Sequence, residues 1–329
     1  MMRNLLTLLV PLALITACGP AAAVKTAPLP AVPMSTTRPA SIPVIVYHEL
    51  DNGCAATVPA CNAADPGSLS KTQFARELAY LKRQGYHSVT AAQYVAWVEH
   101  ETIPLPLKPV LLTDDNGIGD FLEGAQPILR RYGFTVVAFI VTGFADAASG
   151  RCDDVRLQPG CPRINVGWDL TWDQIRALPA QTSFALEAGA SGHYVQDYSP
   201  SCQMFYACVE PGESDAAYER RVGSEMSRGT AELNTQLPRR VNDSVWVVPY
   251  SDLGYPRCAQ PSCTPQPSTG PSGWLVQYAA SRYPVVFVED AVRNGVQHER
   301  FRFEPPGSMS ETSFEQTLNA DIAAGDFGH

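Results

Sequence analysis

The sequence lacks any run of basic residues, and its charged residues give a net charge of −9 at pH 7. A protein that binds nucleic acid needs clustered Lys and Arg to neutralise phosphates, so nucleic acid is not an expected partner. The sequence also lacks zinc-ribbon spacing among its cysteines, which argues against a metal bound by cysteine. No internal repeat is present. With 329 residues, the chain can bury one large core or two modest ones.

The apolar run near the N-terminus is too short to span a bilayer as a mature helix. Residues Leu5–Leu14 are apolar and follow Arg3, and the stretch that ends at Cys18 is typical of a lipobox. We therefore predict that residues 1–18 are a bacterial lipoprotein signal peptide and that Cys18 carries the lipid; an ordinary cleaved signal is the alternative. The expected location is outside the cytoplasmic membrane, at the cell surface or in the periplasm, with a lipid anchor in the membrane.

The next residues, 19–41, consist largely of Pro, Ala, Thr and Ser. Such a segment cannot bury enough apolar surface to fold, so we predict a disordered tether. Residues 42–329 are then expected to form the folded domain, as a monomer.

Eight cysteines remain when Cys18 is set aside from the total of 9. An even number in an exported chain favours disulfides over thiol chemistry. The cysteines fall into close pairs along the chain, and each pair would hold a local loop. The pairs are Cys54 with Cys61, Cys152 with Cys161, Cys202 with Cys208, and Cys258 with Cys263.

The chain is organised around the stretch 110–117, where an apolar run ends in Asp114, Asp115, Asn116 and a glycine. This pattern is typical of a buried strand that delivers polar side chains to a barrel mouth or a cleft. The alternative is that the three polar residues form a turn that caps the following helix.

The segments after this stretch predict a β-α-β unit. Residues 120–132 have apolar side chains at helical spacing and end before Gly133, and residues 135–141 form a second apolar run. Catalytic groups of parallel α/β folds lie at the carboxyl ends of the strands. Further helices are predicted from capping boxes at Ser70 with Gln73 and at Thr171 with Gln174, and a further strand at 183–188.

These segments resemble a known family. Lys108–Gly117, followed by Ala125–Phe134 and Ala138–Thr142, is similar to the first motif of polysaccharide deacetylases, the NodB-homology group or carbohydrate esterase family 4. The Tyr-His pair that ends the strand Pro43–Glu49, and the segment Glu299–Gly307, resemble the branch that acts on poly-β-1,6-N-acetylglucosamine. The resemblance covers residues 43–322.

The resemblance implies an α/β fold, a distorted parallel (β/α) barrel of seven or eight strands. It also implies a hydrolase that removes N-acetyl groups from a polysaccharide. The family uses one Asp as base, a divalent metal held by a second Asp and two His, and a backbone amide near the Tyr of the third motif. Zinc is the predicted metal. The resemblance places Pro249 and Tyr250 in the third motif, with the Tyr250 amide in the oxyanion hole.

The first motif departs from the family's Thr-Phe-Asp-Asp-Gly, which leaves two registers open. Without a gap, Asp114 replaces the Phe, Asp115 is the base, and Asn116 replaces the metal-binding Asp. With Asn116 as an insertion, Asp114 and Asp115 are the catalytic pair. Because successive strand side chains point to opposite faces, the choice decides which carboxylate enters the cleft. In the register without a gap, Asp114 occupies an apolar outer position, which is costly unless it has a partner.

The second motif, in which the family has its two metal-binding histidines, departs further from the family's pattern. Counted from Glu187, the family's two histidine positions fall on Ser191 and Val195. An insertion of two residues instead places His193 at the first position and Asp197 at the second, or Tyr198 in the longer spacing. Histidine with carboxylates is an acceptable ligand set for zinc. A capped turn in a Gly-rich loop explains the same residues.

Three functions follow from these observations. The first is a metal-assisted N-deacetylase with Asp115 as base and with His193 and Asp197 as ligands. The second is a lipid-tethered relative that binds carbohydrate without catalysis. The third is a glycoside hydrolase that uses Asp115 and Glu187 on opposite sides of a sugar bond. The groove is expected to bring together His48, Asp114, Asp115, Asn116, Glu187, His193, Asp197 and Tyr250.

Overall fold

The structure is a computed structural model that describes most of the predicted domain. The predicted signal peptide and all the cysteines lie outside the described residues, so lipidation and the four disulfides stay predictions. Within the described part of the chain, no helix combines the length and apolar character needed to cross a membrane. The described residues are 33–35, 37–50, 68–117, 119–120, 124–151, 169–179, 182–188, 213–238, 240–248, 271–288 and 299–327.

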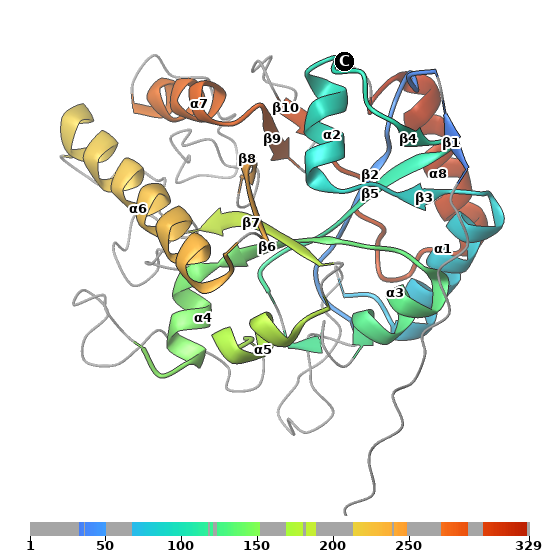
Figure 1. Ribbon diagram of the computed structural model, residues 1–329, viewed down its shortest axis with the longest axis horizontal. Helices are drawn as coiled ribbons and strands as arrows, with labels where there is room; N and C mark the ends of the chain where they lie inside the picture. The colour runs from blue at the N-terminus through green and yellow to red at the C-terminus, as the bar shows by residue number, and fades with distance from the viewer. Residues whose placement is uncertain are drawn as a thin grey trace, which may run out of the picture. The chain divides into compact units, whose positions relative to one another are not determined.

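Parallel strands form a nearly closed barrel (Figure 1), in the order β10-β9-β8-β7-β6-β5-β2. The barrel closes at Phe303, just after β10, which accepts a hydrogen bond from the Val46 amide at 3.0 Å and donates one to the Val44 carbonyl at 2.8 Å. The predicted distorted parallel barrel of seven or eight strands is therefore confirmed. The strands are β2 (Val44–Tyr47), β5 (Pro109–Asp114), β6 (Val137–Val141), β7 (Ser183–Ala188), β8 (Val241–Val247), β9 (Val285–Val288) and β10 (Glu299–Phe301).

The side chains of each strand alternate between the barrel interior and the surrounding helices, because the strand repeat is two residues. In β5, Leu111 packs in the interior with Phe139 and Phe287, which come from β6 and β9. Val110 and Leu112 face the other way, into the layer that the helices cover. Two apolar cores result, one inside the barrel and one outside it.

Helix α2 (Ala91–Val98) closes the barrel at the end where β2 and β5 begin. Its Tyr94 and Trp97 are fully buried and pack with Ile42 and Val89, which lie beside the starts of these strands. The opposite end, where the strands finish, is left for polar groups.

The helices of the outer layer begin at capping residues. Ser70 caps α1 (Lys71–Arg83) by accepting a hydrogen bond from the Gln73 amide at 3.1 Å. The predicted capping box is wrong in its other half, because the Gln73 side chain turns inward to Glu77 and to the Pro306 carbonyl. The box predicted at Thr171 with Gln174 is confirmed at the start of α5 (Trp172–Ala177).

The boundaries of other predicted elements shift by a few residues. Helix α3 (Gln126–Tyr132) covers the second half of the predicted helix, carries Pro in its first turn, and ends at Gly133 with φ 75°. Within the predicted tether, Met34 and Ser35 form β1 and pair with β4 (Leu105–Pro106). The remaining elements are β3 (His87–Ser88), α4 (Thr142–Ala148), α6 (Asp215–Gln236), α7 (Pro271–Arg282) and α8 (Glu311–Ala324).

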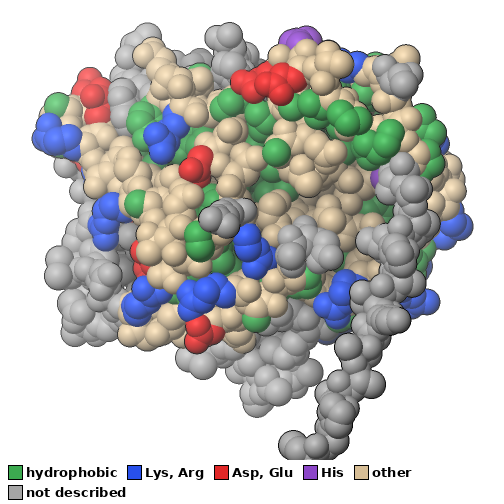
Figure 2. Space-filling view, viewed as in Figure 1, with side chains coloured by type: hydrophobic (Ala, Val, Ile, Leu, Met, Phe, Trp, Pro, Cys, Tyr) green, Lys and Arg blue, Asp and Glu red, His purple; other side chains and the backbone are tan. Residues whose placement is uncertain are grey.

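The surface of the described residues exposes few large apolar side chains. Met34, in β1, and Leu107, just after β4, are 47% and 60% exposed. On the face shown in Figure 2, Lys and Arg side chains (blue) are scattered singly among acidic and uncharged ones.

Candidate functional site

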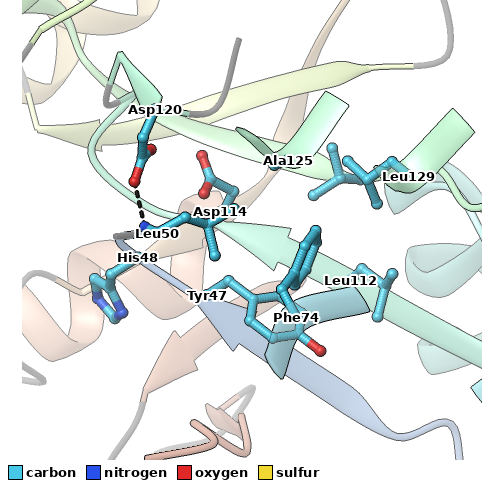
Figure 3. Close-up of a pocket in the computed structure, with 10 residues that line it drawn as sticks. Tyr47, His48, Leu50, Phe74, Leu112, Asp114, Asp120, Ala125 and Leu129 are labelled. Atoms are coloured by element: carbon cyan, nitrogen blue, oxygen red, sulfur yellow. Dashed lines mark hydrogen bonds between the residues drawn. The ribbon is translucent and has the colours of Figure 1, made fainter. Parts of the chain in front are cut away.

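Asp114 and Asp115 lie at the end of β5 and point to opposite faces of the barrel wall. Thr113 and Asp115 both contact Arg302. The ring faces of Phe139 and Phe287 in the barrel interior lie against the same guanidinium. Asp114 instead lines a pocket in the outer layer (Figure 3). Asp115 therefore faces the interior and Asp114 the outer layer, which is the orientation expected in the register without a gap.

Asp115 forms a buried ion pair with Arg302. The two guanidinium nitrogens Nη1 and Nη2 donate to Oδ1 and Oδ2, each at 2.7 Å, and Arg302 is 0% exposed while Asp115 is 1% exposed. The centre of the guanidinium lies 5.7 Å from the Phe139 ring and 5.8 Å from the Phe287 ring. Charge-assisted bidentate geometry and the two ring faces compensate the loss of water around both charges.

His48 extends this pair toward the surface. Its Nε2 atom lies 3.8 Å from Oδ2 of Asp115, and its Nδ1 atom lies 3.0 Å from Oε1 of Glu304. The side chains of His48 and Glu304 are 24% and 36% exposed, whereas Asp115 is buried. A row of alternating groups therefore runs from the barrel interior to solvent, and we call these four residues the charged row: Arg302, Asp115, His48 and Glu304.

Asn116 is held by Glu187 through two hydrogen bonds. The Asn116 backbone amide donates to Oε2 at 2.7 Å and its side-chain Nδ2 donates to Oε1 at 2.8 Å. Asn116 has φ 75°, a left-handed conformation that Asn adopts more readily than most residues, and Gly117 follows with φ 73°. Trp246 fixes the other side of Glu187, because its Nε1 donates to the Glu187 carbonyl at 3.0 Å. Both oxygens of the Glu187 carboxylate therefore accept from Asn116.

Asp114 lies in a small pocket between the barrel and helices α1 and α3. In Figure 3 its carboxylate points toward Asp120, whose Oδ2 accepts a hydrogen bond from the Leu50 amide. His48 and Tyr47 also line the pocket, and the other lining side chains are apolar. Asp114 is 5% exposed, and its Oδ2 atom has no hydrogen-bond partner among the described residues. Burial, followed by the nearby charges of Asp120 and Asp115, raises the pKa of Asp114 well above its usual value.

The described residues do not by themselves fit a metal centre. Asn116 presents its side-chain N–H to Glu187, and both oxygens of Asp115 accept from Arg302. Among the residues that the structure covers, no group of three or more His, Cys, Asp or Glu could hold a metal ion. The other predicted ligands and third-motif residues, His193, Asp197, Tyr198, Pro249 and Tyr250, lie outside the described residues.

Three charged groups near the site were missed from the sequence. Arg302 and Glu304 come from the segment just after β10, where the barrel closes, and the alternating charges at Arg300, Arg302 and Glu304 were the available signal. Asp169 was also missed: the Leu170 amide donates to the Gly117 carbonyl at 3.2 Å, which places Asp169 beside the end of β5. Burial raises the pKa of Asp169 to about 6. Trp172 and Trp246, whose role the sequence left open, both fill the core and are at most 1% exposed.

Comparison with known proteins finds relatives that are named as polysaccharide deacetylases, and the chain spans about a third of the length of these curated relatives. No protein-family model matches the chain. Over 203 residues, or 58% of the chain, it is 26% identical to the poly-β-1,6-N-acetyl-D-glucosamine N-deacetylase of Escherichia coli (strain K12), but the match covers only 29% of that protein.

Solved structures share the fold over most of the chain. A de-N-acetylase from Aggregatibacter actinomycetemcomitans has a TM-score of 0.59 at 18% identity, covering 84% of this chain and 98% of that one. A Streptococcus pyogenes deacetylase in complex with acetate has a TM-score of 0.54 at 17% identity, covering 85% and 99%. At such identities these structures show the fold alone. The shared fold, the sequence match and the predicted motifs together identify the chain as a homologue of the polysaccharide deacetylases.

Proposed function

We propose that this protein is a hydrolase that removes N-acetyl groups from an extracellular polysaccharide containing N-acetylglucosamine. The observation that carries the proposal is the charged row at the carboxyl end of the barrel strands. It combines a carboxylate with a histidine that is partly open to solvent, which are the groups needed for general acid–base catalysis. The homology to polysaccharide deacetylases supports the same reaction class.

In the proposed reaction, Asp115 takes a proton from water while the water oxygen bonds to the acetyl carbon. A carboxylate offers about four acceptor sites, and Arg302 uses two of those of Asp115. His48 then gives a proton to the sugar nitrogen as the C–N bond breaks, and acetate is released. Glu304 and Asp115 lie on the two sides of the imidazole ring and hold it between them.

A divalent metal would polarise the acetyl carbonyl and activate the water. Metal binding here would depend on His193 and Asp197, because the described residues do not fit a metal by themselves. The oxyanion role of the Tyr250 amide rests on the motif resemblance alone.

Of the two alternative functions, one is favoured by an observation in the structure and the other is not. A lipid-tethered relative that binds carbohydrate without catalysis is favoured by one observation, the Asn116 amide held by Glu187 where the family has a metal-binding Asp. A glycoside hydrolase gains no support from the described residues, because Glu187, the second carboxylate that it needs, is buried and accepts two hydrogen bonds from Asn116.

The test is acetate release from oligomers of β-1,6-N-acetylglucosamine by the purified protein, with and without added zinc, cobalt or nickel. We expect the wild type to release acetate and His48→Gln to be slower by about 100-fold or more, since general acid–base catalysis contributes about that factor. His87→Gln is the matched control, because His87 pairs with Pro109 at the opposite end of β5.

Binding of the oligomer without acetate release, under every metal condition, would instead establish the carbohydrate-binding relative. Metal content of the purified protein and of His193→Ala, by elemental analysis, tests the metal separately. About one metal per chain that His193→Ala loses is the result expected for a metal-assisted enzyme.

A further inference from the structure

The segment that carries Glu304 has few backbone N–H groups that could hold it in place by hydrogen bonds. Glu304 is followed by Pro305 and Pro306, which have no backbone N–H to donate. The Glu304 side chain is 36% exposed, so its contact with His48 depends on how the backbone of this segment is held. The Pro306 carbonyl is the anchor, and it accepts from the Met309 amide at 2.9 Å and from Nε2 of Gln73 at 2.9 Å.

Gln73 reaches Pro306 from the first turn of α1. It is 4% exposed, and Nε2 also donates to Oε1 of Glu77 at 2.9 Å. Because both partners are oxygens that accept, the orientation of the Gln73 amide is fixed, and both of its N–H groups are used. One buried side chain therefore connects α1 to the segment that holds Glu304.

Glu77 lies behind Gln73 and also faces β2. It is 2% exposed, and burial raises its pKa to about 7. The Tyr47 side chain is close enough that the charge of Glu77, after burial, contributes to raising the pKa of Tyr47 well above its usual value. Tyr47 directly precedes His48. Glu77 thus lies between the strand that carries His48 and, through Gln73, the segment that carries Glu304.

We propose that Gln73, supported by Glu77, is a positioning residue that holds Glu304 against His48. Neither residue belongs to the charged row; they act through the Pro306 carbonyl and the end of β2. The inference rests on the proposed function for its effect on turnover. Its effect on the Glu304 segment does not depend on that function.

The experiment compares Gln73→Leu with Gln126→Leu in the full-length protein. Gln126 is the matched control, because it is also a 4% exposed glutamine in a helix and donates to Thr182 Oγ1 at 3.2 Å, away from the charged row. Amide hydrogen exchange of residues 303–309 is measured for both variants, together with kcat and KM for acetate release.

We expect Gln73→Leu to speed exchange in 303–309 by about tenfold over Gln126→Leu, the effect of losing about one hydrogen bond. We also expect kcat to fall by about tenfold with KM within about twofold, because a misplaced catalytic group slows the chemical step. Equal exchange in the two variants, or an unchanged kcat in Gln73→Leu, would overturn the proposal. If the wild type releases no acetate, the proposed function fails, and exchange alone decides the positioning.

A second pair of variants guards against a general loss of folding. Glu77→Gln keeps an acceptor oxygen for Gln73, whereas Glu77→Leu removes it at similar volume. Exchange in 303–309 should stay near wild type in the first and rise in the second. Equal exchange in the two variants would show that Glu77 acts only by filling space, and would remove its supporting role.

Discussion

Asp114 and Asp115 are neighbours in the chain, yet they occupy opposite environments. Asp115 faces the barrel interior, where Arg302 balances its charge through two hydrogen bonds. Asp114 faces the outer layer, where one of its oxygens has no hydrogen-bond partner among the described residues and burial raises its pKa. Both residues are at most 5% exposed. For these two residues, the presence of a partner, and not the degree of burial, therefore decides the free-energy cost of a buried carboxylate.

The largest effect on stability is expected from removing the partner of Asp115. Arg302→Met removes both close hydrogen bonds to the buried Asp115 carboxylate and leaves His48, at 3.8 Å, beside it, so we expect the free energy of unfolding to fall by about 3–5 kcal/mol. Urea denaturation at pH 7 measures this loss. A fall of less than about 1 kcal/mol would mean that Asp115 is hydrated or protonated in the folded protein.

The double variant Arg302→Met with Asp115→Leu is the control. Because it removes both charges at similar volume, it should recover much of the lost stability, as apolar replacements of buried ion pairs commonly do. Acetate release should be abolished in the double variant whatever its stability, because the proposed base is gone.

A smaller effect is expected from neutralising the other carboxylate. Burial raises the folded-state pKa of Asp114 above the unfolded value of about 3.9, so the folded protein keeps a proton that the unfolded chain loses. Stability is then fully present below about pH 3.9 and falls by at most about 1.4 kcal/mol per pH unit as the pH rises toward the folded pKa. Asp114→Asn removes this loss, so its gain in stability over the wild type should grow as the pH rises.

Urea denaturation from pH 4 to pH 8 measures the gain, and Asp173→Asn is the control. The Asp173 side chain is 90% exposed, so its replacement should change stability by less than about 0.5 kcal/mol at every pH. A gain for Asp114→Asn that does not grow with pH would place the effect in packing and not in ionisation.

The barrel was predictable because its signals are local or periodic. Apolar runs marked the strands, and the Thr171–Gln174 box marked α5. The strand repeat also showed that the register at Asp114 would decide which carboxylate faces the interior. What the sequence left open was the register itself, because it depends on where Arg302 lies, 187 residues further along the chain.

The charged row shows more clearly what could not be predicted from the sequence. His48, Asp115 and Asn116 stand at strand ends and were predicted to lie near one another. Arg302 and Glu304 were missed, because pairing across the closure of a barrel leaves no short-range pattern in the sequence. Gln73 was assigned to a capping box, since a local hydrogen bond is the simplest prediction for that residue, and its contact with Pro306 spans 233 residues.

The smallest effect on stability is expected at Asn116, which occupies the position of the family's metal-binding Asp. Asn116→Asp keeps the left-handed backbone accessible but replaces the N–H donor to Glu187 with a like charge, so unfolding should become easier by about 1–2 kcal/mol at pH 8. Asn116→Gly removes the same hydrogen bond without the charge, so the difference between the two variants measures the repulsion.

If His193 and Asp197 supply further ligands, zinc should restore stability to Asn116→Asp and not to Asn116→Gly, because only a carboxylate completes the family's ligand set. Equal responses to zinc would mean that position 116 is a structural clamp on Glu187 and that metal, where bound, does not use it.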